Sequence, residues 1–180
     1  MTFTRMDEST AAEWQAIVGE TMEQQPRVAE SVLAMLASLE RITDNFAVDQ
    51  LVHSLQTATR AEEAGASQEV IVASLCHDIG KAISVINHPR IAAEILRPYV
   101  SHDTFQMILT HQDFQGRHYY EFIGLDPNAR DQHKGASWYG LAEQFADDWD
   151  QISFDPDYPT KPLAHFEPMV REVFGSFTSL

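Results

Sequence analysis

Six residues of the kinds that bind metal ions constrain this sequence more than any other feature. They are His53, His77, Asp78, His88, His111 and Asp150. A histidine followed directly by an aspartate supplies an imidazole for one metal ion and a carboxylate that can bridge to a second. Four imidazoles and two carboxylates suit iron, manganese or zinc better than calcium or magnesium. The residues therefore predict a metal centre with nitrogen and oxygen ligands.

Two of the histidines are predicted to lie on, or directly after, helices with apolar stripes. His53 and Gln56 share one face of a predicted helix, which places His53 at the edge of the core. His111 follows a helix that begins near Ser101 and whose apolar residues also repeat at helical spacing.

The other candidate ligands are predicted to lie at helix ends. Ser67 could cap a helix that leads into His77-Asp78 and is expected to end at Gly80. His88 directly precedes Pro89, a residue favoured in the first turn of a helix. Every proposed ligand thus borders an apolar helix face.

The rest of the chain also predicts helices, with one clear loop. Ser9-Thr10 could cap a first helix, and residues 28–39 form a second, both expected to cover the core. Residues 136–149 and 163–177 carry further apolar stripes, and 155–159 has turn residues. Without repeats, low-complexity tracts or strand-like alternation, the pattern predicts an all-helical bundle.

Composition limits the class of protein. A chain of 180 residues suits one compact domain that buries about 70% of its unfolded surface. A formal charge of −15 disfavours nucleic acid and anionic membranes as partners. Cys76 cannot form an internal disulfide, and we expect it to fill space in a helix rather than bind metal. With no signal peptide or membrane-spanning run, we expect a soluble cytoplasmic protein.

His53, the HDIGK stretch from His77 to Lys81, His88, His111 and Asp150 together resemble the HD-domain superfamily, over about residues 48–150. The resemblance implies an all-α HD-domain bundle with flanking N- and C-terminal helices, in a single domain spanning residues 1–180. Within it, the HSLQTA run from His53 to Ala58 is similar to the HD-domain di-iron oxygenases. These include myo-inositol oxygenase and the oxygenase that cleaves 2-amino-1-hydroxyethylphosphonate. The interval from Asp78 to His88 is similar to the phosphonate branch and Lys81 to the inositol branch, so the chain matches neither branch fully.

The resemblance also implies a ligand set and a reaction. One iron ion would bind His53, His77 and Asp150, the other His88 and His111, with Asp78 as the bridge. Such a mixed-valence pair uses molecular oxygen (O2) to remove hydrogen from a hydroxylated small molecule, after which an adjacent bond is cleaved. Manganese, zinc or magnesium are the alternative metals.

Two further residues, Lys81 and Gln56, receive roles on this basis, and the choice of the last ligand rests on it as well. Lys81 either neutralises an alkoxide or anionic group near the metals or is a solvated cation at a helix end. Gln56 is placed to orient imidazoles by hydrogen bonds. Asp150 is preferred as the last ligand because Trp149-Asp150 is similar to the closing motif of the phosphonate branch. Asp147 is the alternative.

The substrate is less constrained by the sequence. The phosphonate branch has a lysine four residues after its last histidine ligand, where this chain has Gln115. That branch also has an arginine three residues before its final aspartate, where this chain has Asp147. These differences disfavour a phosphonate, although cations elsewhere could replace the missing ones. Candidates for that replacement are Arg90, Arg117 and Lys134.

Residues 113–120, with Trp138-Tyr139, either form the wall of a small polar pocket or pack in the core. Among histidines outside the pattern, His118 is the best candidate for a role.

Two other functions fit the ligand list. A metal-dependent HD phosphohydrolase would use a metal-bound hydroxide to attack a nucleotide or phosphomonoester. Cyclic-dinucleotide phosphodiesterases are disfavoured because paired histidines and a Gly-Tyr-Pro segment are missing after HDIGK. The third alternative is a metal-binding module without catalytic activity.

Overall fold

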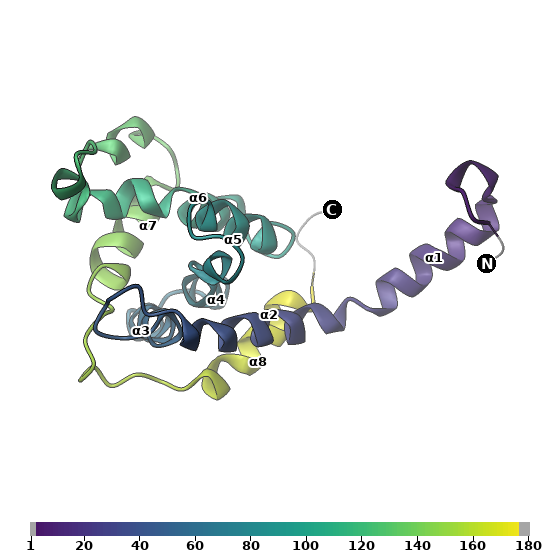
Figure 1. Ribbon diagram of the computed structural model, residues 1–180, viewed down its shortest axis with the longest axis horizontal. Coiled ribbons are helices and arrows are strands. Elements are labelled where there is room, and N and C mark those ends of the chain that lie inside the picture. The colour runs from purple at the N-terminus through teal and green to yellow at the C-terminus, as the bar shows by residue number, and fades with distance from the viewer. Residues whose placement is uncertain (1–2, 177–180) are drawn as a thin grey trace.

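Eight α-helices form the fold of residues 3–176, the part of the chain that this computed structural model describes (Figure 1). They are α1 (Ala11–Glu23), α2 (Pro26–Ser38), α3 (Gln50–Glu63), α4 (Gln68–Cys76), α5 (His88–Leu96), α6 (His102–Gln115), α7 (Tyr139–Gln144) and α8 (Leu163–Phe174). Short 3-10 helices and one π-helical turn, η7 (Phe145–Asp150), connect them. Residues 3–176 contain no strand, which confirms the prediction of an all-α bundle.

Helix α4 lies at the centre of the bundle. All its residues from Val70 to Cys76 are buried, because the sequence VIVASLC is apolar or small on every side of the helix. Helices α3, α6 and α8 pack against it, and α2 lies alongside α8 (Figure 1). Cys76 is fully buried in this core, in agreement with its expected role as a space filler. None of the described helices has the length and apolar character needed to span a lipid bilayer.

Helix α1 begins as predicted but does not cover the core. Thr10 caps it, and Glu13 completes a reciprocal capping box. The helix then extends away from the bundle as an arm (Figure 1), and it has no buried residue. Gln24 and Gln25 keep right-handed helical backbone angles, so α1 continues outward from α2 instead of folding back. The expectation that both N-terminal helices cover the core is therefore correct only for α2.

Two other predicted helices differ at their ends. The stripe predicted over residues 136–149 is divided between α7 and the π-helical turn η7. The last helix begins at Leu163 as expected and ends at Phe174, and the predicted terminal residue Phe177 lies outside the described residues. Residues 155–159 form the predicted loop.

Gly80 has a different role from the predicted helix end. Helix α4 stops at Cys76, and Gly80 lies within the 3-10 helix η3 (Ile79–Ala82). A Cβ atom at Gly80 would lie 2.4 Å from the carbonyl oxygen of His88 and 2.7 Å from its Cα. The missing side chain therefore lets η3 pack directly on the backbone at the start of α5, close to two predicted ligands.

We expect Gly80→Ala to lower the free energy of unfolding by about 1–3 kcal/mol, because backbone atoms must move to accept the methyl group. Urea denaturation would measure the change. Gly140→Ala in α7 is the matched control, since an added Cβ meets no atom within 4 Å. Equal stability of the two variants would contradict the close packing at Gly80.

Candidate metal centre

The four predicted histidine ligands share one hydrogen-bonding pattern. Each Nδ1 donates to a backbone carbonyl: His53 to Ser153 (2.9 Å), His77 to Ser74 (2.8 Å), His88 to Val85 (2.7 Å) and His111 to Ile108 (2.7 Å). A carbonyl oxygen only accepts, so the hydrogen of each neutral ring is on Nδ1. Each Nε2 is left with a free lone pair.

These Nε2 lone pairs point at one another. The Nε2 atoms of His53 and His77 are 3.1 Å apart, and those of His88 and His111 are 3.2 Å apart. Two lone pairs at this distance repel unless a cation lies beside both. Asp150 Oδ1 is also buried and accepts no hydrogen bond from the described residues, yet it lies 3.1 Å from His53 Nε2. The orphaned acceptors fit a bound metal ion.

The six residues form two buried groups of three. His53, His77 and Asp150 make one, and Asp78, His88 and His111 the other, with the ligand atoms of each within 4.8 Å of one another. Asp78 lies between the groups. Its Oδ2 is 3.3 Å from His77 Nε2, whereas its Oδ1 is 2.9 Å from His88 Nε2. Each carboxylate oxygen thus faces a different group, as a bridging ligand would.

The charges of the site favour cation binding. Burial opposes ionisation of Asp78, but His77, His88 and Lys81 outweigh it and hold the pKa of this carboxyl well below its usual range. Burial alone would lower the pKa of His77, but Asp78 and Asp150 raise it. Burial, together with His77, lowers the pKa of His111 to about 4. At neutral pH the site therefore offers ionised carboxylates and a neutral His111.

The π-helical turn η7 determines which late aspartate enters the site. Asp150 is fully buried in the group with His53, while Asp147 faces another way and pairs with Arg130 and His118, each at 2.9 Å. A π turn contains one more residue than an α turn and so rotates the following side chains. The structure brings Asp150, and not the alternative Asp147, together with His53.

Gln56 lies one step further from the centre than expected. Its amide nitrogen donates to the Asp155 carbonyl (2.6 Å), and its amide oxygen accepts from the Asp155 backbone nitrogen (3.3 Å). It holds the loop that carries Ser153, the acceptor for His53, and Phe154, whose ring stacks on His53 with centroids 4.2 Å apart. Gln56 thus contacts the loop behind the imidazole and not the imidazole itself.

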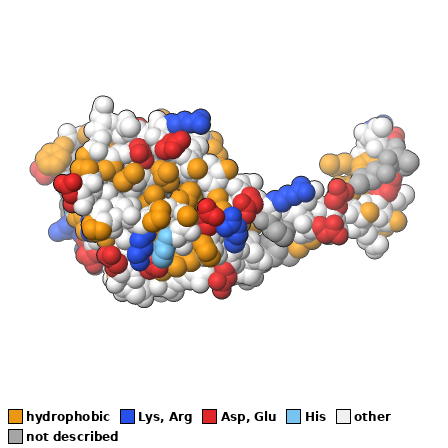
Figure 2. Space-filling view, turned by 90° about the horizontal axis from the view of Figure 1, so that it is seen from below, with side chains coloured by type: hydrophobic (Ala, Val, Ile, Leu, Met, Phe, Trp, Pro, Cys, Tyr) orange, Lys and Arg blue, Asp and Glu red, His pale blue; other side chains and the backbone are white. Residues whose placement is uncertain are grey.

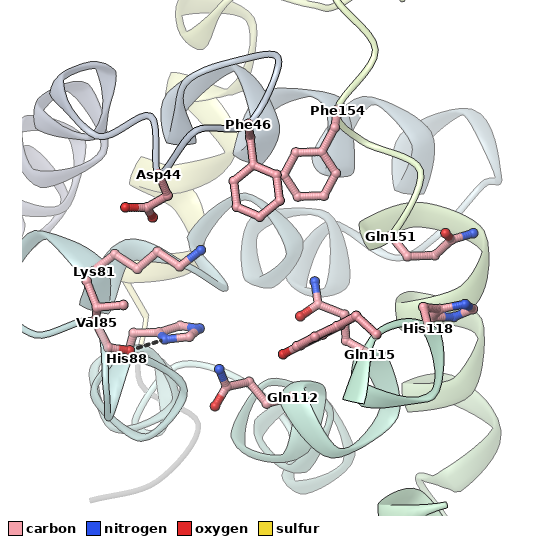
Figure 3. Close-up of a pocket in the computed structure, with 11 residues that line it drawn as sticks. Asp44, Phe46, Lys81, Val85, His88, Gln112, Gln115, His118, Gln151 and Phe154 are labelled. Carbon is pink, nitrogen blue, oxygen red and sulfur yellow. Dashed lines mark hydrogen bonds between the residues drawn. The ribbon is translucent and has the colours of Figure 1, made fainter. Parts of the chain in front are cut away.

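Lys81 lies beside the candidate ligands. Its amine is 2.7 Å from Asp78 Oδ2 and donates to Gln50 Oε1 at 3.0 Å. It also borders a cavity of about 630 Å³ that reaches His88 (Figure 3). The lining residues are Asp44, Phe46, Lys81, Val85, His88, Gln112, Gln115, His118, Tyr119, Gln151 and Phe154.

The predicted pocket segment contributes in part to this cavity. Gln115, His118 and Tyr119 line it, whereas Phe114 and Trp138 are buried in the core. The Gln115 amide also donates to Asp150 Oδ2 at 3.0 Å. The three cations considered as replacements for phosphonate-binding residues are not among the lining residues described.

Sequence reasoning missed much of the opposite wall. Phe46 stacks on Phe154 with centroids 4.4 Å apart, and Figure 3 shows the two rings side by side at the edge of the pocket. Both residues lie in irregular loops. Asp44 and Asn45, which have positive φ angles of 47° and 63°, form the turn before Phe46. Adjacent Asp and Asn tolerate this conformation well, and this was the one signal available in the sequence.

Comparison with known protein families gives a match over more than half of the chain. The protein family described as HD domain matches residues 51–155. This segment includes every residue of the two buried groups. No curated protein matches the chain.

We expect Asp78→Ala to abolish binding at both metal positions, because it removes the carboxylate that faces both groups. Metal analysis of purified protein should give two ions per chain for the unaltered protein, one for each group. His102→Ala, an exposed control, should retain both ions. Two tightly held ions in the Asp78 variant would contradict the bridging role.

A second pair of variants separates the late aspartates. Asp150→Asn should lose the ion at the group with His53, whereas Asp148→Asn, two residues away and exposed, should keep it. The same metal analysis measures both. Retention by the Asp150 variant would mean that another residue supplies this ligand.

Proposed function

The chain belongs to the HD domain family, and from this premise we propose that it is a di-iron oxygenase that uses O2 to oxidise and cleave a small hydroxylated substrate. HD domain proteins are generally metal-dependent enzymes, so the family supports a metal-dependent reaction. The choice of iron and oxygen rests on the resemblance of the HSLQTA and HDIGK segments and on the features of the pocket.

The observation that carries the proposal is the position of Asp78 between two histidine pairs. One carboxylate oxygen faces His77 and the other faces His88, so two metal ions could share this residue. Four imidazoles with two carboxylates suit redox-active iron as well as zinc or manganese. A dinuclear centre of this composition supports oxygen chemistry more directly than a single hydrolytic metal does.

The charge of the pocket disfavours a phosphorylated substrate. Lys81 is the one lysine or arginine among the described lining residues, and Asp78 and Gln50 already bind its amine. Asp44 adds a carboxylate to the same lining, which would repel a phosphate group. Three glutamines supply neutral donors and acceptors instead. An uncharged or weakly charged alcohol fits this lining better than a phosphate ester.

Several side chains have clear tasks in such a reaction. Burial, with Tyr120 nearby, raises the pKa of Tyr119 to about 12, so its hydroxyl stays protonated and can donate to a substrate oxygen. Lys81 would stabilise negative charge that develops on the substrate hydroxyl as its proton leaves. The ring of Phe154 stacks on His53 and that of Phe46 on Phe154, so this aromatic wall would limit the access of water to the imidazole. When bound, an iron pair supplies the oxygen activation that these side chains cannot perform.

A metal-dependent phosphohydrolase is the second candidate, because the HD domain match fits that activity at least as well. In that case Lys81 would contact a phosphoryl oxygen, and manganese, zinc or magnesium could replace iron. The oxygenase reaction requires O2 and the phosphohydrolase reaction does not, so the dependence of turnover on O2 distinguishes the two candidates.

We expect the iron-loaded protein to consume oxygen in stoichiometric proportion to a small alcohol substrate, measured with an oxygen electrode during a screen of polyols and amino alcohols. Phosphomonoesters and nucleotides should be poor substrates, because the pocket offers them one cation that is already paired. Turnover of a phosphate ester without oxygen, at rates typical of enzymes (on the order of 1–10³ s⁻¹), would support the hydrolase instead.

We expect Lys81→Met to keep both metal ions and the melting temperature but to lower kcat/KM by about tenfold or more, because the amine acts on substrate charge. Metal analysis, thermal melting and substrate kinetics would measure these effects. Lys134→Met, which alters an exposed lysine outside the pocket, is the control. Unchanged kinetics in the Lys81 variant would remove this role.

A further inference from the structure

Among the residues that the structure describes, helix α1 buries none of its side chains against the body of the chain. Its 13 residues include no buried side chain, although Thr10 and Glu13 build a complete capping box at its start. Isolated helices of about 12–15 residues are marginal in water, and Gly19 in the interior lowers helix stability by about 1 kcal/mol relative to alanine. A helix of this kind needs an apolar contact to remain folded.

One face of α1 is suited to such a contact. Trp14, Val18 and Met22 recur every four residues and are 38%, 56% and 44% exposed. The ring of Phe3 lies beside Trp14, with centroids 6.2 Å apart, and extends this apolar stripe. With 3.6 residues per turn, the acidic side chains of the helix fall on the opposite side. These are Glu13, Glu20 and Glu23.

The exposed surface of the chain is larger than its mass predicts. It measures 9702 Å² for a 20.3 kDa chain, whereas a compact monomer of that mass exposes about 8,800 Å². The excess is about 900 Å², and a stable protein interface buries about 800 Å² on each partner. Figures 1 and 2 show the arm standing clear of the body in two perpendicular views. The chain therefore exposes more surface than a compact monomer would, as expected if a partner covers the arm.

The charge of the arm excludes two classes of partner. Residues 3–23 contain five acidic side chains and one arginine. Anionic membranes and nucleic acids would repel this segment, and a membrane-surface helix usually carries lysine or arginine on its polar face. A protein surface is the remaining class.

We propose that α1 pairs with α1 of a second copy of this chain in an antiparallel homodimer. The stripe is symmetric about Val18, because Trp14 and Met22 each lie four residues from it. A two-fold axis at Val18 places each Val18 against its counterpart and Trp14 against Met22 of the second copy. A methionine sulfur next to an aromatic ring is favourable, and the acidic faces of both helices point outward.

Cross-linking tests this arrangement. Val18→Cys should form a disulfide-linked dimer under mild oxidation, because the two cysteines face each other across the axis. Ala16→Cys is the control, since residue 16 lies on the opposite side of the same helix. The native Cys76 does not compete, because it is fully buried and burial raises the pKa of its thiol to about 12. We expect at least about tenfold more cross-linked dimer from Val18→Cys than from Ala16→Cys on a non-reducing gel.

Light scattering gives an independent readout. The unaltered protein should have twice the 20.3 kDa chain mass, Val18→Glu should shift it to the single-chain mass, and Ala16→Glu should leave it dimeric. Unchanged metal content in all three, with a helical circular dichroism signal that loses at most the contribution of α1 in Val18→Glu, would show that each body is folded. A single-chain mass for the unaltered protein up to about 100 μM would overturn the proposal and leave α1 to a different protein. Equal cross-linking at residues 16 and 18 would also overturn it.

Discussion

Four hydrogen bonds from histidine Nδ1 to backbone carbonyls are the interaction on which the candidate site depends. They fix the tautomer of each ring, so four Nε2 lone pairs converge in a buried space. In three cases the acceptor lies three residues earlier in the same segment, and local backbone geometry orients the ring. His53 is the exception, because its acceptor, Ser153, comes from a loop that Gln56 holds in place. The long-range architecture of the bundle is thus needed to orient only one of the four imidazoles.

The sequence was sufficient to predict the helical class and to select six residues that the structure brings together. This worked because helical spacing indicates which residues are buried. A residue such as His77, which directly follows a buried apolar helix, must itself be buried. The predictions for α1 and Gly80 were wrong where three-dimensional packing decides the outcome. Periodicity shows that α1 has an apolar face but not which surface covers it. Likewise, a glycine after a helix looks like a cap, whereas Gly80 permits contact with the His88 backbone.

The pocket wall could not be predicted because it comes from irregular segments. Phe46 and Phe154 lie in loops far apart in sequence and meet only through their stacked rings. Asp147 illustrates a related difficulty, since its carboxylate stands where the phosphonate branch has an arginine. The structure shows that buried Arg130 neutralises it, so the position is a paired charge and not a vacant anion site. Local pairing, which sequence does not report, decides how a charged residue affects the pocket.

The hydrogen bond from His53 to Ser153 also affects the order in which the two groups of ligands can form. Asp78, His88 and His111 lie within a short stretch of α4 to α6, so this group can assemble once residue 111 and the helices around it have formed. The group with His53 needs Asp150 and the Ser153 carbonyl, which is 100 residues away. Contacts between such distant residues close late, because a long loop must be ordered first. During translation, the ligands of one group are therefore synthesised before those of the other, and both groups are complete only after residue 153 has been made.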